Sequence, residues 1–381
     1  MQETLKNELI KHRRYLHQNP ELGLELPNTF SYVKNVLESY GYKPERCGEN
    51  GIVATVGQGS KVVLLRADMD ALPLNEQTDF AHKSKIKNCM HACGHDMHTT
   101  MLLGAAKMLK ETENNLNGVV KLMFQPGEEI LKGANNMIKA GILENPKPEA
   151  AFMVHVSTGI PLETGTLIVS APGTVAPSSD HFTITINGKG CHGSMPQSGT
   201  DPIIAASQFL ISVQALQTRE FAHKKILLTF GIFHAGESAN AIPDAAVLSG
   251  TLRTFDEETR TQCKERMENL LKNCVRSFEC DANIRYTAEC PPVICDKNLS
   301  EFAMKNLTNT ISSDSIPKGT GSEDFAFISQ KIPSVLVYIP AGDSRNGYTY
   351  PLHNPRAMFD ENALMVGAYA YRDFAVKYLN K

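Results

Sequence analysis

Long apolar runs are missing from this sequence of 381 residues, and its nine cysteines show no short-spaced pattern. No stretch approaches the roughly 20 apolar residues that a membrane-spanning helix needs. Residues 1–14 are polar and amphipathic and lack the apolar core of a secretory signal peptide. The low density of cysteine excludes a small disulfide-rich scaffold and favours reduced thiols. We therefore expect a globular protein of the cytoplasm that does not bind membranes.

An excess of charge of one sign is also absent. Lys and Arg number 38 against 41 Asp and Glu, which gives a formal net charge of -3. This balance leaves no basic surface of the kind that binds nucleic acids or anionic membranes. Hydrophobic residues make up 42% of the chain, so a sizeable core is available. The length suggests about two domains.

The first part of the sequence alternates helical patterns with short apolar runs. The runs at residues 52–56, 62–65, 119–124 and 150–154 are typical of buried strands, and Asp96–Lys110 has a helical pattern. Alternating strands and helices of this kind predict an α/β fold built on an open, mostly parallel sheet.

The pattern changes after about residue 178. The segments that follow predict a strand, a helix, two strands, a helix and a strand, which is the ferredoxin-like α+β order. After about residue 290 the α/β pattern returns, with a strand at Val335–Ile339 and a closing helix at Glu361–Leu379. We expect residues 1–178 and 290–381 to form a catalytic metal-binding domain, with residues 179–289 inserted as a lid and dimerisation domain. The inserted elements are expected at Asp180–Asn187, Asp201–Thr218, Ile226–Phe233, Ala246–Phe255, Glu257–Phe278 and Asn283–Thr287.

Residues suited to catalysis follow the predicted strands, where open α/β sheets place their functional groups. Asp68 and Asp70 follow one strand, Glu128 and Glu129 follow another, and His155 follows a third. Adjacent carboxylates repel each other unless a cation lies nearby. In a metallohydrolase one glutamate would bind metal while the other takes a proton from water. Two solvated loop carboxylates are the alternative.

A second cluster precedes the helix predicted from residue 96. Cys93 and His95 stand two residues apart, and a thiolate and an imidazole are good ligands for zinc and similar metals. Asp96 is placed to cap the helix. The alternative is a buried cysteine with polar capping neighbours, but three histidines, a cysteine and an aspartate within eight residues favour metal. His155 and His353 alone are compatible with ordinary structural histidines.

The sequence resembles the M20 metallopeptidase and amidohydrolase superfamily, in the branch of hippurate hydrolases, auxin-conjugate hydrolases and N-acetyl-diaminopimelate deacetylases. The similarity runs over nearly the whole chain, and the block from His91 to His98 is highly specific to this branch. It differs from the usual pattern at Gly127, Gln197 and Asn354, which leaves the acyl-group preference open. The other matching segments are residues 16–23, 66–73, 125–129, 188–193, 240–243, 250–253 and 321–325.

The resemblance implies a centre of two divalent metal ions: manganese, zinc, cobalt or nickel. Cys93 would bridge the ions, and Asp70 would orient a ligand. Glu128 would be the general base. The remaining metal ligands would be His95 and His155 for one ion, and Glu129 and His353 for the other.

The resemblance also implies roles for the inserted domain. His192, from this chain or from a partner subunit, would stabilise the oxyanion, while Asn240 and Arg253 would hold the carboxylate of the substrate. We therefore expect a metal-dependent amidohydrolase, or deacylase, for small N-acyl amino acids, and a homodimer formed through edge strands of the inserted domain.

Three alternatives stay open on the sequence alone. A metallo-aminopeptidase or dipeptidase would use similar metals but would recognise a free amine. A non-catalytic binding protein on this fold would have no need of Glu128 as a base. A thiol redox enzyme built on Cys93 lacks a resolving cysteine in a Cys-x-x-Cys arrangement, since Cys89 lies four residues before it.

Overall fold

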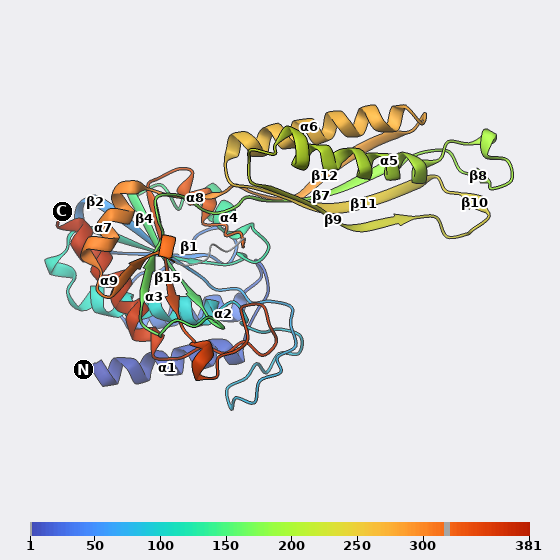
Figure 1. The fold of residues 1–381 in the computed structure, drawn as a ribbon. Coiled ribbons are helices and arrows are strands. Elements are labelled where there is room, and N and C mark those ends of the chain that lie inside the picture. The colour runs from blue at the N-terminus through green and yellow to red at the C-terminus, as the bar shows by residue number, and fades with distance from the viewer. Residues whose placement is uncertain (1, 316–320) are drawn as a thin grey trace. The chain divides into compact units, whose positions relative to one another are not determined.

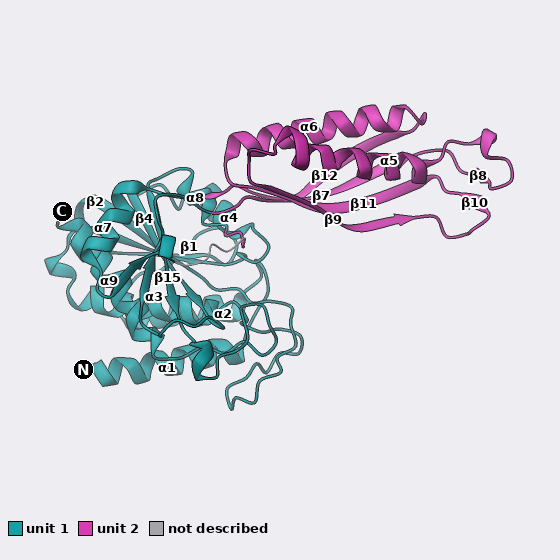
Figure 2. Cartoon of the chain, viewed as in Figure 1, with its two compact units in different colours: residues 1–175, 294–319, 324–381 teal, residues 176–293, 320–323 magenta. Residues whose placement is uncertain are grey.

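The computed structural model describes residues 2–315 and 321–381, and the chain forms two compact units (Figure 2). Unit 1 comprises residues 1–175, 294–319 and 324–381, and unit 2 comprises residues 176–293 and 320–323. Met1 and residues 316–320, which fall within the predicted catalytic segments, lie outside the described residues. The assignment of catalytic and lid roles to these parts of the chain stays a prediction.

Unit 1 is built on a mainly parallel sheet, as the alternation of strands and helices predicts (Figure 1). Parallel pairs join β2 to β3, β2 to β4, β4 to β15 and β5 to β14, whereas β1–β2 and β5–β15 are antiparallel. The strands are β1 (Glu45–Arg46), β2 (Ile52–Asp68), β3 (Asn117–Gln125), β4 (Ala150–Ser157), β5 (Leu167–Val169), β14 (Thr310–Ser312) and β15 (Ser334–Pro340). Their near-continuous apolar character reflects burial of both sheet faces.

Helices α3 (His95–Glu111) and α9 (Ala363–Leu379) pack against each other and against β2 and β4. Helix α1 (Gln2–Gln18) covers α3. Gly104 permits this close packing, because a Cβ there would lie 2.8 Å from a methyl group of Leu9 and 2.9 Å from the Cβ of Ala368. The other helices of unit 1 are α2 (Pro27–Ser39), α4 (Gly133–Lys139), α7 (Lys297–Asn306) and α8 (Ala326–Ser329), with the short turns η1 (Glu113–Asn115), η4 (Ser313–Ser315) and η5 (Ser344–Asn346).

Unit 2 is a four-stranded antiparallel sheet, and Figure 2 shows both of its long helices on one face. The strand order β12-β7-β11-β9 and the chain order β-α-β-β-α-β are those of a ferredoxin-like domain. Its elements are β7 (Ser179–Asn187), α5 (Pro202–Ala215), η3 (Leu216–Glu220), β9 (Ile226–Ala235), β11 (Ala245–Thr254), α6 (Glu257–Arg276) and β12 (Asp281–Cys290).

The helices of unit 2 begin at aspartates. Asp201 accepts hydrogen bonds from the first backbone N–H groups of α5, and Asp256 accepts one from Thr259 in α6. A short ribbon of β8 (Cys191–His192) and β10 (Ala241–Ile242) extends unit 2, with the turn η2 (Pro196–Ser198) beside it. The strands β6 (Gly173–Ala176) and β13 (Val293–Cys295) pair where the chain passes from one unit to the other. No helix among residues 2–315 and 321–381 has the length and apolar character to cross a membrane.

Candidate metal centre and active site

The site of unit 1 lies where the parallel strands end. Asp68 is the last residue of β2, Gln125 is the last residue of β3, and the two are register partners. His155 lies near the end of β4, and α3 begins at His95. Because the carboxyl ends of parallel strands meet at one edge, residues far apart in sequence come together there.

Two triads of possible metal ligands share the Cys93 sulfur. The first consists of Cys93, His95 and His155, and the second of Cys93, Glu129 and His353. Within each triad the ligand atoms lie within 4.8 Å of one another. These five residues are the predicted ligands, and their assignment to two metal ions stays a prediction.

The separations between ligand atoms suit one ion in each triad. The Cys93 sulfur lies 3.6 Å from Nε2 of His155, and Oε2 of Glu129 lies 3.6 Å from Nε2 of His353. Two ligands of a tetrahedral zinc ion, at about 2.3 Å for sulfur and about 2.0 Å for nitrogen, stand about 3.5 Å apart. The donor set of thiolate, imidazole and carboxylate therefore fits divalent transition metals.

Protonation equilibria in the site also fit cations. Burial and the Glu129 carboxylate raise the pKa of the Cys93 thiol well above its usual value, so the thiolate needs a positive charge beside it. Burial, aided by nearby imidazoles, lowers the pKa of His155 and His353 and keeps both rings neutral. Nδ1 of His155 donates to the Val156 carbonyl oxygen at 2.7 Å, which leaves the lone pair of Nε2 toward Cys93.

His353 is held in an unusual backbone conformation. Its φ of 62° lies in the left-handed region, which residues other than glycine seldom adopt. Its backbone N–H donates to the Ala92 carbonyl oxygen at 2.9 Å, next to Cys93. Strained residues of this kind persist where their surroundings fix them, often at functional sites.

Asp70 supports the loop that carries both glutamates. Its carboxylate accepts the backbone N–H groups of Glu128 at 3.0 Å and Glu129 at 3.1 Å. The same carboxylate lies 3.4 Å from Nδ1 of His95. Neither ring nitrogen of His95 makes a hydrogen bond within the described part of the chain. Asp70 therefore touches one predicted ligand and fixes the backbone of another.

Sequence reasoning gave no role to a buried pair beside these ligands. Nδ1 of His98 donates to Asp68 at 2.6 Å, and Nε2 of His98 accepts the Val156 N–H at 2.8 Å. The carbonyl oxygen of the same residue, Val156, accepts from Nδ1 of His155, so the pair helps to fix the backbone that orients a predicted ligand. The only signal in the sequence was the place of His98 in a histidine-rich block.

The expectation that Asp96 caps α3 is wrong. Gly94, with a φ of 87°, occupies the N-cap and no side chain caps the helix. The buried Asp96 carboxylate instead accepts from Nε of Arg13 at 2.9 Å and from Nδ1 of His17 at 2.8 Å. Two side-chain donors from α1, Arg13 and His17, take this carboxylate in place of the backbone N–H groups of the helix start.

In unit 2 the structure brings together two of the three predicted residues. His192 in β8 pairs with Ala241 in β10, and Gly193 donates to the Asn240 carbonyl oxygen at 2.8 Å. Nδ1 of His192 accepts the Ser194 backbone N–H at 3.1 Å, so Nε2 is the ring nitrogen left to donate. Arg253 lies elsewhere, near the far end of β11, where it donates to Ser322 Oγ at 2.7 Å.

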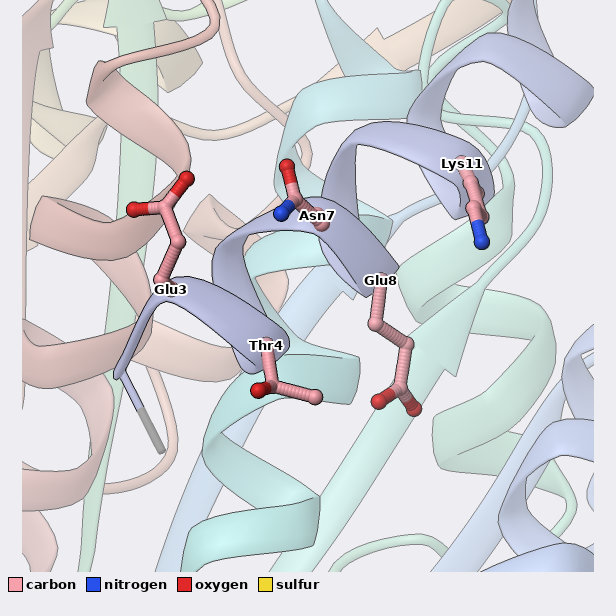
Figure 3. A pocket seen from close by; sticks show the side chains of 5 residues that line it. All are labelled: Glu3, Thr4, Asn7, Glu8 and Lys11. Carbon is pink, nitrogen blue, oxygen red and sulfur yellow. The ribbon is translucent and has the colours of Figure 1, made fainter.

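A hollow on the surface of α1 is separate from this site. Figure 3 shows the side chains that line it, none of which is a predicted site residue. They are Glu3, Thr4, Asn7, Glu8 and Lys11.

Comparison with known proteins identifies relatives over almost the whole chain. The model of peptidase family M20/M25/M40 matches residues 64–377. The IAA-amino acid hydrolase ILR1-like 2 of Arabidopsis thaliana is 36% identical over 98% of this chain and 85% of its own length. The N-acetyl-L-cysteine deacetylase of Bacillus subtilis is 35% identical over 99% and 89%, and the hippurate hydrolase of Campylobacter jejuni is 33% identical over 98% and 97%.

A solved structure shares the fold as well. A dinuclear metal-binding peptidase of family M20 from Bacillus subtilis superposes with a TM-score of 0.84 at 30% identity. The match covers 99% of each chain.

Proposed function

The chain belongs to peptidase family M20/M25/M40 and is a hydrolase of amide bonds, and from that premise we propose that it deacylates small N-acyl amino acids with two divalent metal ions. The observation that carries the proposal is the pair of ligand triads sharing Cys93, with Glu128 beside them. Relatives named for N-acetyl-L-cysteine, hippurate and IAA-amino acids support the substrate class.

Five residues would hold the metals, with Cys93 common to both ions, His95 and His155 on one, and Glu129 and His353 on the other. A divalent pair supplies Lewis-acid activation of water and of the scissile carbonyl group. Manganese, zinc, cobalt and nickel all suit this mixed donor set. Asp70 would hold the Glu129 loop and the His95 ring in position.

Glu128 would act as the general base. It is only 5% exposed, and one of its carboxylate oxygens accepts a backbone N–H from Asp324. Its other oxygen lies 3.9 Å from Nε2 of His95, close to the ligands yet outside hydrogen-bonding distance. That oxygen would take the proton of the attacking water and later deliver it to the departing nitrogen.

Unit 2 would recognise the substrate. His192, whose Nδ1 accepts the Ser194 backbone N–H, would donate from Nε2 to the oxyanion of the tetrahedral intermediate. Arg253, with Asn240, would bind the substrate carboxylate, since a guanidinium fork fits two carboxylate oxygens. We assign this unit the lid role and a homodimer interface. No disulfide joins the cysteines of the described residues, which supports a cytoplasmic location.

The test is a panel of acetyl, benzoyl and succinyl amino acids assayed with each candidate metal, alongside unblocked dipeptides. We expect cleavage of blocked substrates with a free carboxylate. Cleavage of the free dipeptides alone would instead establish a metallo-aminopeptidase or dipeptidase. Activity toward neither class would overturn the proposed substrate class.

A further inference from the structure

A fully buried polar network ties three separate segments together behind the predicted base. Arg66 near the end of β2, Gln125 at the end of β3 and Asp324 are each 0% exposed. One carboxylate oxygen of Asp324 accepts from Arg66 at 2.8 Å and from Gln125 at 2.7 Å. Its other oxygen accepts the backbone N–H of Ala134 at 2.9 Å.

The residues of the network that lie on the strands are also hydrogen-bonded to one another. Arg66 also donates to Gln125 Oε1 at 2.9 Å and to Asp68 at 2.7 Å. Even a fully hydrogen-bonded buried ion pair is often no more stabilising than apolar residues of similar volume, so the network points to a role in fixing these groups in place. Its members include Gln125, three residues before Glu128, which places the network directly behind the catalytic loop.

The backbone of Asp324 makes the connection to the base. Its N–H donates to Oε1 of Glu128 at 3.3 Å. The residue is the first of unit 1 after the chain leaves unit 2, and it begins the turn that precedes α8. The buried side chain of Asp324 therefore anchors the backbone of this junction beside Glu128.

We propose that Asp324 is a positioning residue for the general base: its buried carboxylate, locked by Arg66 and Gln125, fixes the backbone N–H that holds one oxygen of Glu128. The other oxygen, which lies 3.9 Å from Nε2 of His95, is the one that would exchange the proton. This inference rests on the proposed role of Glu128. Asp324 itself does not touch the substrate and acts only through the orientation of Glu128.

The first test is Asp324→Asn, which keeps the size of the side chain but turns an N–H donor toward a site where every partner donates. We expect kcat to fall about 10- to 100-fold, since a misplacement of about 1 Å costs up to about 100-fold. KM and metal content should stay at wild-type values. Gln125→Met removes one hydrogen bond to the same carboxylate and should lower kcat several-fold in the same pattern, even if Asp324→Asn fails to fold.

A matched control comes from unit 2, where Asp180 forms a buried pair with Arg260 through two bonds of 2.7 Å. Asp180→Asn should lower the unfolding temperature and leave kcat unchanged. A loss of kcat in this variant equal to that of Asp324→Asn would assign both effects to general destabilisation and overturn the proposal.

The second test is a double-mutant cycle with Glu128→Gln. If Asp324 acts through Glu128, adding Asp324→Asn to Glu128→Gln should lower kcat no further. Independent, multiplying losses would refute the positioning role. So would wild-type kcat in Asp324→Asn, or a loss of metal in step with activity. Full activity of Glu128→Gln by itself would instead refute the base, which separates the two failures.

Discussion

At the scale of single residues, the neighbours Glu128 and Glu129 have the same side chain but different surroundings. Asp70 accepts both backbone N–H groups and so fixes the two residues together. The Glu129 carboxylate then lies 3.6 Å from His353, whereas the Glu128 carboxylate accepts from Asp324. Local geometry thus gives the proposed ligand and the proposed base different surroundings within one dipeptide.

This separation predicts different outcomes for the two amide variants. Glu128→Gln should lose about 100-fold or more in kcat while keeping its metal, since a general base contributes about that much. Glu129→Gln should lose metal together with activity. Elemental analysis beside steady-state kinetics distinguishes them, and retention of more than about a tenth of the rate in Glu128→Gln would contradict its assignment.

Arg253 provides a second prediction at this scale. Its guanidinium group donates a hydrogen bond to Ser322 Oγ, and this bond fixes the orientation of the planar group. Wild-type enzyme should prefer an N-acyl amino acid over its carboxamide, and Arg253→Ala should lose about 10- to 100-fold of that preference, because hydrogen bonds to charged groups contribute about 1.5–3 kcal/mol. Arg253→Lys is the control and should restore little, because lysine lacks the planar fork. Equal cleavage of acid and amide by wild type would exclude carboxylate recognition.

Residues of the site differ in how far the sequence could predict them. Cys93 and His95 stand together in one short block, so their chemistry is visible in the sequence. Asp324 pairs with Arg66, which lies on β2, 258 residues earlier in the sequence. No local sequence pattern predicts that pairing. The prediction that Asp96 caps α3 was wrong for the same reason, because Asp96 binds the distant residues Arg13 and His17 instead.

At the scale of elements, the turn between β3 and α4 decides where the glutamates lie. Gly127 has a φ of 71°, and its carbonyl oxygen accepts the N–H groups of Lys132 at 3.1 Å and Gly133 at 3.0 Å. At Gly133 a Cβ would stand 1.6 Å from the carbonyl oxygen of Pro126. The turn is therefore closed so tightly that a side chain cannot enter without moving it.

Gly133→Ala should displace this turn. We expect a loss of about 1–3 kcal/mol in the free energy of unfolding, the usual cost of overpacking, together with weaker metal binding. Gly231→Ala is the control, since nothing lies within 4 Å of a Cβ at that position in β9. Thermal unfolding and metal titration compare the two, and equal metal affinity in both variants would contradict the role of the turn.

Element order was readable from the sequence because alternation with a period of two marks the half-exposed strands of unit 2. The sequence did not show which strands are neighbours in the sheet, because strand pairing and register depend on contacts between distant segments. The strand order β12-β7-β11-β9 had to come from the structure.

At the scale of the whole molecule, the proposed ligands for one ion are as far apart in sequence as Cys93 and His353, and all lie within unit 1. Removing the metals should therefore destabilise unit 1 and leave unit 2 unaffected. A metal ion present at about 1,000 times its Kd adds about 4 kcal/mol to the free energy of unfolding. Calorimetry after chelation should show only one transition moving, and activity should return with added divalent metal. Full activity after prolonged chelation would contradict the metal requirement.

The exposed apolar residues of unit 2 predict its assembly. β9 is an edge strand that exposes Ile232 and Phe233, and α5 exposes Ile211. Edge strands with apolar side chains pair readily across a two-fold axis. We expect a homodimer by light scattering at micromolar concentration, and Ile232→Lys should shift it toward monomer. Lys264→Gln, at a residue already in contact with Glu289, is a control that should not. A fully active wild-type monomer would contradict this interface.

The position of β15 in the sheet has a consequence for biosynthesis. This strand, residues 334–340, lies between β4 and β5, which the ribosome makes far earlier. Unit 2 is almost continuous in sequence and can fold while the chain is still growing, but the sheet of unit 1 keeps an open slot until β15 emerges. During that interval the edges of β4 and β5 are exposed to unwanted pairing. His353 follows later still, so the nascent chain cannot bring together the proposed metal ligands before this residue has been made.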